Sequence, residues 1–326
     1  MQLPENQWYV VLCSAELRRK PVGAERLGRR MVFWRDSKRI AHAHPDRCPH
    51  LGASLSGGTV QNDALVCPFH GFAFDGTGAC RHIPANGCEG KIPKGMELST
   101  FPLVEEYGFI WLWLGAPRST YPALPFFPEV AQGWCYRTDV VDWQVHYTRA
   151  IENQLDVAHL ALVHGAAMGQ RGRSFVDGPF VESDAQGIRI WSTNARDTGQ
   201  AQRSQAELGE AAAGLPPRIQ FLFPGTWQLH LGLSIRNIIA FTPINEHSTR
   251  YHLRFYHRVR LPVITYLFEM VMGWSNRLIL NQDRRVVITQ TPANSMDASA
   301  DRHIEADRAI IEFRRRLANL LAPPSR

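Results

Sequence analysis

The pattern of apolar and polar positions divides the chain into two parts that differ in regular structure. Between residues 7 and 114, apolar positions fall in short runs rich in β-branched and aromatic side chains, which is typical of strands. The clearest runs cover residues 8–12, 31–34, 40–44 and 108–114. Turns rich in Asp and Gly separate these runs. The first part is therefore predicted to be a small all-β domain.

The second part alternates like strands and ends in helices. Residues 117–128 contain four prolines and are predicted to connect two domains, 1–120 and 121–326. Strand-like segments follow within 139–145, 175–195 and 218–258, and apolar positions recur at helical spacing from Val263 onward. Residues 195–217 are polar without a strong period, which favours a mobile lid over a pocket; a disordered insertion is the alternative. We expect an α+β protein.

Composition narrows the classes of function. The chain of 326 residues is 44% apolar and 20% charged, as in an ordinary globular protein. Its apolar region at 262–280 is interrupted by polar residues, and its first residues lack the features of a signal peptide, so we expect no membrane span. The net charge of +6 comes without a basic block, which argues against nucleic-acid binding. Six cysteines, two of them in a metal-type spacing, predict a reducing cytoplasm.

Two short loops in the first part carry metal-ligand chemistry. Cys48 and His50 are separated by one residue, Cys67 and His70 by two, and sixteen residues lie between the pairs. Two thiolates and two imidazoles could hold a tetrahedral zinc ion. Each loop, however, mixes one cysteine with one histidine, which suits a two-iron centre in which the histidines serve one iron and the cysteines the other.

A second set of candidate ligands lies in an apolar stretch at 152–164. It contains Asn153, Asp156, His159 and His164. Asp156 and His159 are three residues apart and would share one face of a helix. His159 and His164 are five apart, about 140° around a helix, so the helix must end or bulge between them if both face one ion. Ordinary core histidines are the alternative.

Asp283 continues the apolar face of the helix predicted from Val263 onward. A carboxylate on a buried face must be paired or bind a metal, and an ion pair with Arg277 is the simpler alternative. Together with His159 and His164, this residue makes a set of two histidines and one carboxylate. Such a set holds Fe(II) on one face and leaves positions open.

The first motif closely resembles the Rieske [2Fe–2S] motif, and the whole chain resembles the catalytic α subunit of Rieske non-haem iron oxygenases. The resemblance includes the spacing of Asn153, Asp156, His159 and His164, and the pair Gln282-Asp283 followed by a Gln-Thr-Pro segment. The last pattern is similar to the group of pheophorbide a oxygenase and the saxitoxin-pathway hydroxylases.

The resemblance implies a fold and two cofactors. An N-terminal Rieske domain would bind a [2Fe–2S] cluster through Cys48, His50, Cys67 and His70. A C-terminal helix-grip (START-like) domain, with a seven-stranded antiparallel sheet and a long C-terminal helix, would bind mononuclear Fe(II) through His159, His164 and Asp283. Asp156 would bridge a cluster histidine and an iron histidine, and Asn153 would orient this network without binding iron.

Departures from other Rieske proteins predict the redox behaviour of the cluster. Respiratory Rieske proteins brace the two loops with a disulfide, and the matching positions here are Ala53 and Phe69. Their serine and tyrosine hydroxyls near the cluster sulfurs are matched by Phe72 and Phe74. Fewer hydrogen bonds to sulfur stabilise the reduced state less, so we expect a potential near the low end of the Rieske range, about −150 mV.

The implied function is a monooxygenase that hydroxylates, demethylates or desaturates a largely apolar, cyclic molecule. Electrons would come from NAD(P)H through a separate reductase or ferredoxin, and transfer would cross subunits of a homotrimer. A Rieske electron-transfer protein, a ring cis-dihydroxylating dioxygenase and a zinc-stabilised binding module are the alternatives. Met168, Trp227, Leu229, Leu231, Ile238, Phe241 and Tyr256 are candidate pocket residues, and a place in the core is the favoured alternative for each.

Overall fold

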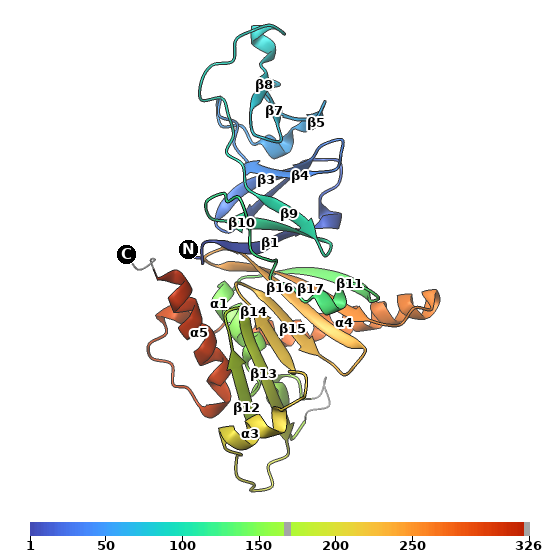
Figure 1. Cartoon of the computed structure of the whole chain (residues 1–326), viewed down its shortest axis with the longest axis vertical. Coiled ribbons are helices and arrows are strands. Elements are labelled where there is room, and N and C mark those ends of the chain that lie inside the picture. Colours follow the sequence, from blue (N-terminus) through green and yellow to red (C-terminus); the bar gives the residue numbers. More distant parts are fainter. Residues whose placement is uncertain (166–170, 323–326) are drawn as a thin grey trace. The chain divides into compact units, whose positions relative to one another are not determined.

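The computed structural model describes residues 1–165 and 171–322. The chain divides into two compact units, Leu3–Pro122 and Ala123–Arg326, which are described separately (Figure 1).

The first unit consists of three antiparallel sheets. Its strands are β1 (Gln7–Cys13), β2 (Val22–Arg26), β3 (Arg29–Arg35), β4 (Ala41–Pro45), β5 (Thr59–Gln61), β6 (Ala64–Val66), β7 (Ala73–Asp75), β8 (Cys80–His82), β9 (Leu103–Glu106) and β10 (Phe109–Leu114). The sheet orders are β1-β10-β9, β2-β3-β4 and β5-β6-β7-β8. Short 3-10 turns lie at Ser14–Glu16, Leu55–Gly57 and Pro84–Asn86. The predicted all-β domain is present.

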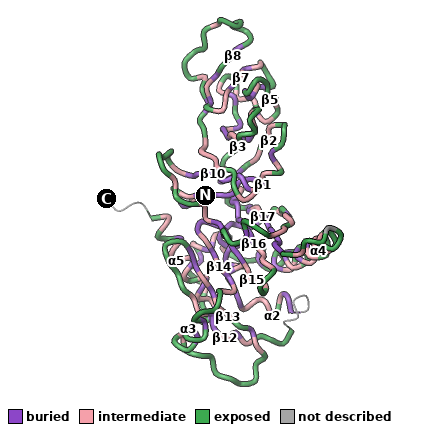
Figure 2. Tube along the Cα trace, turned by 45° about the vertical axis from the view of Figure 1, so that its right-hand side comes forward, coloured by how far each residue is buried: buried purple, intermediate pink, exposed green. Residues whose placement is uncertain are grey.

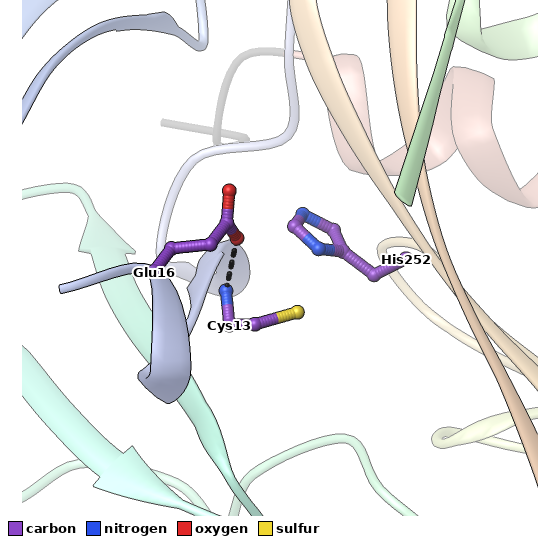
Figure 3. Close-up of side chains that lie close together, drawn as sticks. All are labelled: Cys13, Glu16 and His252. Atoms are coloured by element: carbon purple, nitrogen blue, oxygen red, sulfur yellow. Dashed lines mark hydrogen bonds between the residues drawn. The ribbon is translucent and has the colours of Figure 1, made fainter. Parts of the chain in front are cut away.

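Two apolar cores hold this unit together. One fills the space between β1, β10 and the β2-β3-β4 sheet, with Val11, Phe33 and Leu112 fully or almost fully buried. The second joins Trp34 of β3 to the small sheet and includes the cysteines of both metal-type loops. At the end of β1 the chain turns where the N–H of Cys13 donates to Oε2 of Glu16 (2.7 Å), as Figure 3 shows. Because Cys48 and Cys67 belong to the second core, both metal-type loops are anchored in a packed part of the unit.

The second unit is built on one antiparallel sheet of seven strands in the order β11-β17-β16-β15-β14-β13-β12. Its strands are β11 (Cys135–Trp143), β12 (Phe175–Ser183), β13 (Gly187–Ala195), β14 (Ile219–Leu222), β15 (Thr226–His230), β16 (Ile235–Asn245) and β17 (Ser248–His257). Its helices are α1 (Tyr147–Leu155), α2 (Leu160–Val163), α3 (Gln205–Ala212), α4 (Pro262–Val287) and α5 (Arg308–Leu321). Further 3-10 turns lie at Pro128–Val130, Ser295–Asp297 and Glu305–Asp307. The predicted α+β fold is confirmed.

The helices pack on different parts of the sheet. Helix α1 contacts β16 and β17, α4 contacts β11 and β17, and α5 contacts β12 and β13. Helix α5 buries Ala309, Phe313 and Leu317, which are four residues apart and so share one face. Phe313 packs against Phe221 and Phe223 with ring centroids 5.6 and 5.9 Å away. No helix in the described part of the chain is long and apolar enough to cross a membrane.

The segment 195–217 contains regular structure that the sequence did not predict. It contains helix α3, which begins with a capping box between Ser204 and Glu207. Leu208 and Ala212 are buried, and α3 packs against β12. A disordered insertion is therefore contradicted for the helical part, whereas a lid stays a prediction. The helix was missed because eight residues have too few turns to show a clear period in a polar sequence.

The outer part of α4 leaves large apolar side chains in solvent, and Figure 2 shows much of this helix coloured as exposed. Trp274 is 70% exposed and Val271 59%. In contrast, Leu280, Asp283 and Val287 in the last part of the helix are buried. The inner end of α4 therefore belongs to the core, whereas its outer end presents an apolar surface.

Candidate metal centres

The two metal-type loops of the first unit have the same backbone design. The N–H of Cys48 donates to the carbonyl of Ala53 (2.8 Å), and the N–H of Cys67 donates to the carbonyl of Phe72 (2.8 Å). In each loop the glycine four residues after the cysteine donates its N–H back to the cysteine carbonyl, at 2.9 and 3.1 Å. Both glycines, Gly52 and Gly71, have positive φ (78° and 71°), which other residues rarely adopt.

The loops place cysteines inside and histidines outside. Cys48 and Cys67 are buried, whereas His50 and His70 are exposed with ring centroids 4.9 Å apart. Phe72 stacks on the His50 ring at 4.7 Å and 8°. This arrangement fits a two-iron cluster whose cysteine-bound iron faces the core and whose histidine-bound iron faces outward.

The sulfurs need a positive partner to be thiolates. The pKa of the Cys48 thiol is raised to about 11, mainly by burial and also by the neighbouring Cys67 sulfur, whereas the amides of His50 and Leu51 act in the opposite direction. None of the six cysteines is in a disulfide, so the absence of a brace between the loops, expected from Ala53 and Phe69, agrees with the structure. A paired thiol site of this kind suits iron or zinc ligation.

The second centre lies where α1 ends. Helix α1 stops at Leu155, and Asp156 takes an extended conformation (φ −68°, ψ 124°). Side chains from two strands bind the backbone at this helix end. Trp227 Nε1 of β15 donates to the carbonyl of Gln154 (2.9 Å), and Asn194 Nδ2 of β13 donates to the carbonyl of Val157 (3.0 Å). The expectation that Asp156 and His159 share one helix face was wrong, because these contacts and the Asp156 side chain interrupt the helix before His159.

His159, His164 and Asp283 nevertheless converge. His159 and His164 flank the one-turn helix α2, while Asp283 comes from the buried end of α4. Nε2 of His164 is 2.7 Å from Oδ1 of Asp283, and Nε2 of His159 is 3.6 Å from the same oxygen. One ligand atom from each residue lies within 4.8 Å of the others, as ligands of one ion require.

The environment of this triad fits a divalent cation. Asp283 is 3% exposed and His164 1%. Although burial opposes it, the carboxylate of Asp283 and the amide of Gln282 raise the pKa of His164. The position between Nε2 of His164 and Oδ1 of Asp283 therefore favours a positive charge, which a metal ion would also supply. The donor set of two imidazoles and one carboxylate suits ferrous iron.

Gln282 fixes the orientation of His164. Its Oε1 lies 2.9 Å from Nδ1 of His164, so Nδ1 donates to Gln282 and Nε2 is the nitrogen that faces Asp283 and would bind a metal. Gln154 makes a longer contact, from Nε2 to Oδ2 of Asp283 (3.5 Å). Neither role was predicted from the sequence, although Gln282 adjoins Asp283 and could have been suspected for that reason.

Asp156 and Asn153 lie beside the triad. Oδ2 of Asp156 is 3.5 Å from Nδ1 of His159, and its Oδ1 accepts the N–H of Ala158 (2.6 Å). Burial acts to raise the pKa of the Asp156 carboxyl, but His159 and the backbone amides hold it below its usual value. Asn153 lines a cavity with Asp156 and His159, and its buried Nδ2 has no hydrogen-bond partner among the described residues.

Arg277, the alternative partner of Asp283, binds elsewhere. Its Nη2 donates to Oδ1 of Asp139 in β11 at 2.6 Å. The ion pair between Asp283 and Arg277 is therefore excluded, and the carboxylate of Asp283 instead lies beside the rings of His159 and His164.

Two cavities reach the triad. The first, about 270 Å³, is lined mostly by apolar side chains of the sheet and α4, including Trp227, Leu229, Leu231, Ile239 and Leu253. Of the predicted pocket residues, Trp227, Leu229 and Leu231 line it, whereas Ile238, Phe241 and Tyr256 do not and are core residues. Met168 lies outside the described residues. Alternation explains the position of Ile238, which faces the opposite side of β16 from Ile239.

The second cavity, about 390 Å³, is charged. It contains a buried ion cluster in which Glu152 accepts from Arg149 (3.2 Å) and from Arg314 of α5 (2.6 Å). Both arginines also contact Asp301, at 3.2 and 2.9 Å. The sequence did not reveal this cluster, because Arg314 is 162 residues from Glu152. Asp156, His159 and Asp283 line both cavities, so the triad lies between an apolar and a charged space.

Comparison with known proteins agrees with both centres. Residues 7–102 match the model of the Rieske [2Fe-2S] domain, and residues 143–323 match the vanillate O-demethylase oxygenase C-terminal domain. The second match alone covers more than half of the chain. The chain belongs to the Rieske oxygenase family.

Individual members of the Rieske oxygenase family show the extent of the likeness. The chain is 33% identical over 178 residues to the vanillate O-demethylase oxygenase subunit of Pseudomonas sp. strain HR199, covering 52% of this chain and 47% of the relative. It is 36% identical over 170 residues to the dicamba O-demethylase oxygenase component of Stenotrophomonas maltophilia, covering 51% and 49%. The chain thus spans about half the length of the curated relatives it matches.

The fold agrees over a longer stretch. A crystal structure of dicamba monooxygenase bound to dicamba superimposes with a TM-score of 0.77, covering 98% of each chain at 22% identity. The resemblance to Rieske oxygenases, the fold and the [2Fe–2S] domain expected from the sequence are therefore confirmed. A mononuclear iron is the second cofactor of this family of non-haem iron oxygenases, and the triad has the donors to hold it.

Proposed function

We propose that this protein is the oxygenase component of a Rieske monooxygenase, which oxidises a C–H bond of a largely apolar, cyclic small molecule by hydroxylation, demethylation or desaturation. The observation that carries the proposal is the triad of His159, His164 and Asp283 at the wall of an apolar cavity. In this proposal residues 1–120 form the cluster domain and residues 121–326 the catalytic domain.

The proposed ligands are assigned by residue. Cys48, His50, Cys67 and His70 would hold the [2Fe–2S] cluster, and His159, His164 and Asp283 the mononuclear Fe(II). When bound, the cluster supplies single electrons and the ferrous ion supplies the activation of O₂. The chain supplies the setting: exposed His50 and His70 give an electron donor access, and Gln282 keeps His164 in the tautomer that can bind a metal.

Asp156 is proposed as the link between the two centres. What supports this role is its contact with Nδ1 of His159 and its position on the wall of the charged cavity. A carboxylate there can accept the proton of His159 and a proton of a histidine that approaches from that cavity. Asn153 would orient this network without binding iron. Replacing Asp156 by Asn should leave both metals bound and slow electron transfer; loss of the mononuclear iron would instead make Asp156 a ligand.

Self-association is proposed as a homotrimer. What supports contact between copies is the apolar outer face of α4, which consists of exposed large side chains: Val263, Ile264, Tyr266, Leu267, Met270, Val271, Trp274 and Leu278. Monomers seldom expose so large an apolar patch without a partner. Light scattering after size exclusion should give a trimer, and Val271→Glu should shift it toward monomer. A monomeric wild type, or a trimer indifferent to Val271→Glu, would contradict this use of α4.

Electrons are proposed to come from NAD(P)H through a separate reductase or ferredoxin in the cytoplasm and to cross between subunits. Cys48→Ala and Asp283→Ala chains, each inactive alone, should recover turnover when they assemble together. Absence of recovery in verified mixed oligomers would count against transfer between subunits.

The experiment that tests the function is product analysis by mass spectrometry under ¹⁸O₂, with a generic reductase and a panel of cyclic substrates. A product that carries the label, or a demethylated or desaturated product formed only with O₂, supports the proposal. Reduction of the cluster with no O₂-dependent product from any substrate would instead support the electron-transfer alternative.

A further inference from the structure

Two asparagines in the apolar cavity leave hydrogen-bonding groups unused. Asn237 comes from β16 and Asn276 from α4, and both line the cavity beside the triad. Nδ2 of Asn237 lies 3.5 Å from Oδ1 of Asn276, at the long limit for a hydrogen bond. Oδ1 of Asn237 and Nδ2 of Asn276 are buried and have no partner among the described residues.

The position of Asn276 makes this observation significant. The residue is 5% exposed, although it lies on a helix whose neighbouring positions Trp274 and Arg277 are exposed. Buried polar groups in native proteins are nearly always hydrogen-bonded, and an unsatisfied one calls for a partner that arrives with a ligand. The rest of the cavity wall is largely apolar, so two amides there serve to fix the orientation of a bound molecule.

The amide pair offers one donor and one acceptor, whichever way the two side chains are turned. As placed, Asn276 presents N–H groups and Asn237 presents a carbonyl oxygen. Turning both amides exchanges these roles and again leaves one donor beside one acceptor. Turning only Asn237 would present two donors but bring two carbonyl oxygens to 3.5 Å, and turning only Asn276 would present two acceptors but bring two amide nitrogens to the same distance. The pair therefore disfavours a ligand group that only accepts hydrogen bonds.

We propose that Asn237 and Asn276 determine specificity by binding a neutral substituent that both donates and accepts a hydrogen bond, a hydroxyl or a carboxamide, on the substrate. This inference rests on the proposed oxygenase function and adds the chemical class of the substrate. An ionised carboxylate or sulfonate has acceptors only and would leave Oδ1 of one asparagine facing a negative oxygen. By anchoring one end of the molecule, the pair sets which C–H bond faces the triad.

Arg218 is the competing group, because it also lines the cavity and could attract an anion. Burial lowers its pKa, and Nη1 donates to the carbonyl of Ser192 at 3.4 Å. Arg218 and Ser192 also line a separate small cavity beneath α3, so the arginine is shared between two spaces. The asparagine pair belongs only to the cavity at the triad. Recognition of an anion through Arg218 is therefore the alternative outcome of the test.

The test measures binding by isothermal titration calorimetry on the holoenzyme under argon without an electron donor, so that no turnover occurs. The probes are benzamide, benzoate and toluene, which share a ring and differ in the polar group. We expect benzamide to bind about tenfold or more tightly than either of the others. Asn276→Leu, which keeps the branching at Cγ but removes the polar atoms, should remove this preference, and Asn237→Leu should do the same from the other element.

Asn281→Leu is the matched control, because Asn281 is an exposed asparagine on the same helix. It should bind all three probes as the wild type does. Tighter binding of benzoate, equal binding of the three probes, or a preference for benzamide that survives both Asn→Leu variants would overturn the inference. Oxygenase turnover is scored separately: selective binding without O₂-dependent product contradicts the proposed function alone, and turnover without this selectivity contradicts the inference alone.

Discussion

The two proposed metal centres are built in opposite ways. The cluster site consists of two loops with the same internal hydrogen bonds, each of which places its cysteine and histidine within four residues. The iron site gathers its donors from a broken helix and from the buried end of α4, and His164 is 118 residues from the glutamine that orients it. One site is formed by local backbone geometry, whereas the other exists only when the second unit has folded around it.

This difference has consequences for robustness. A loop that closes through its own backbone bonds needs few distant contacts, so changes elsewhere should leave the cluster intact. The triad depends on contacts between α1, α2, α4 and the sheet, including the bonds from Trp227 and Asn194 that end α1. Changes far from the iron should therefore weaken the iron site first.

The largest expected effect comes from removing one ligand of each site. Cys48→Ala should abolish the Rieske EPR signal and the acid-labile sulfide while leaving the mononuclear iron in place. Asp283→Ala should do the reverse, because two imidazoles alone bind iron weakly. Metal and sulfide analysis with EPR checks both variants. A cluster lost together with Asp283 would show that the two sites do not assemble independently.

The redox potential is expected to distinguish this cluster from high-potential Rieske centres. Phe72 stacks on His50, and Phe74 is fully buried. Because both residues are phenylalanines, neither position offers a hydroxyl to the cluster sulfurs. An EPR-monitored titration should give a midpoint near the low end of the Rieske range, about −150 mV. A strongly positive midpoint would mean that other hydrogen bonds to sulfur outweigh the missing hydroxyls.

A smaller effect is expected from Gln282→Leu. Without the acceptor at Nδ1, His164 is no longer held in its metal-binding tautomer, and Fe(II) affinity should fall by about 10- to 100-fold. Competition with a chelator measures this affinity. Gln282→Glu, which keeps an acceptor, should retain most of it, and the cluster signal should be unchanged in both variants. Equal loss in both would mean that packing, rather than the hydrogen bond, is what matters.

The smallest effect concerns the start of α1. Burial lowers the pKa of His146, the N-cap residue of α1, from 6.5 to about 4. Between these values the unfolded chain binds more protons than the folded one, so the contribution is present above pH 6.5 and is lost as the pH falls toward 4. The slope is at most about 1.4 kcal/mol per pH unit.

Urea unfolding near pH 5 and near pH 7.5 checks this prediction. His146→Asn keeps a good N-cap without a titrating group, so the variant should lose less stability than the wild type as the solution becomes acidic. An identical acid loss in both proteins would show that His146 does not titrate in this window.

The sequence predicts the cluster site better than the iron site, because the first is formed by local loops and the second by residues far apart in the chain. The cluster loops and their proposed ligands could be predicted, because Cys48 and His50, and Cys67 and His70, lie close together in the sequence and each pair sits on one short loop. The strands and the long helix were predicted from their periods. The end of α1 at Leu155 could not be predicted, because tertiary hydrogen bonds from β13 and β15 decide it. Helix α3 was missed because its eight residues show no clear period, and the ion cluster at Glu152 was missed because Arg314 is 162 residues away in the sequence.

The central claim is that one chain carries two iron centres, one that delivers electrons and one that uses them on O₂. The most direct measurement is the iron and acid-labile sulfide content of the purified protein, together with its EPR spectrum. The account predicts a Rieske-type signal and an iron-to-sulfide ratio of three to two. Colourless protein that contains only zinc and no labile sulfide would contradict it.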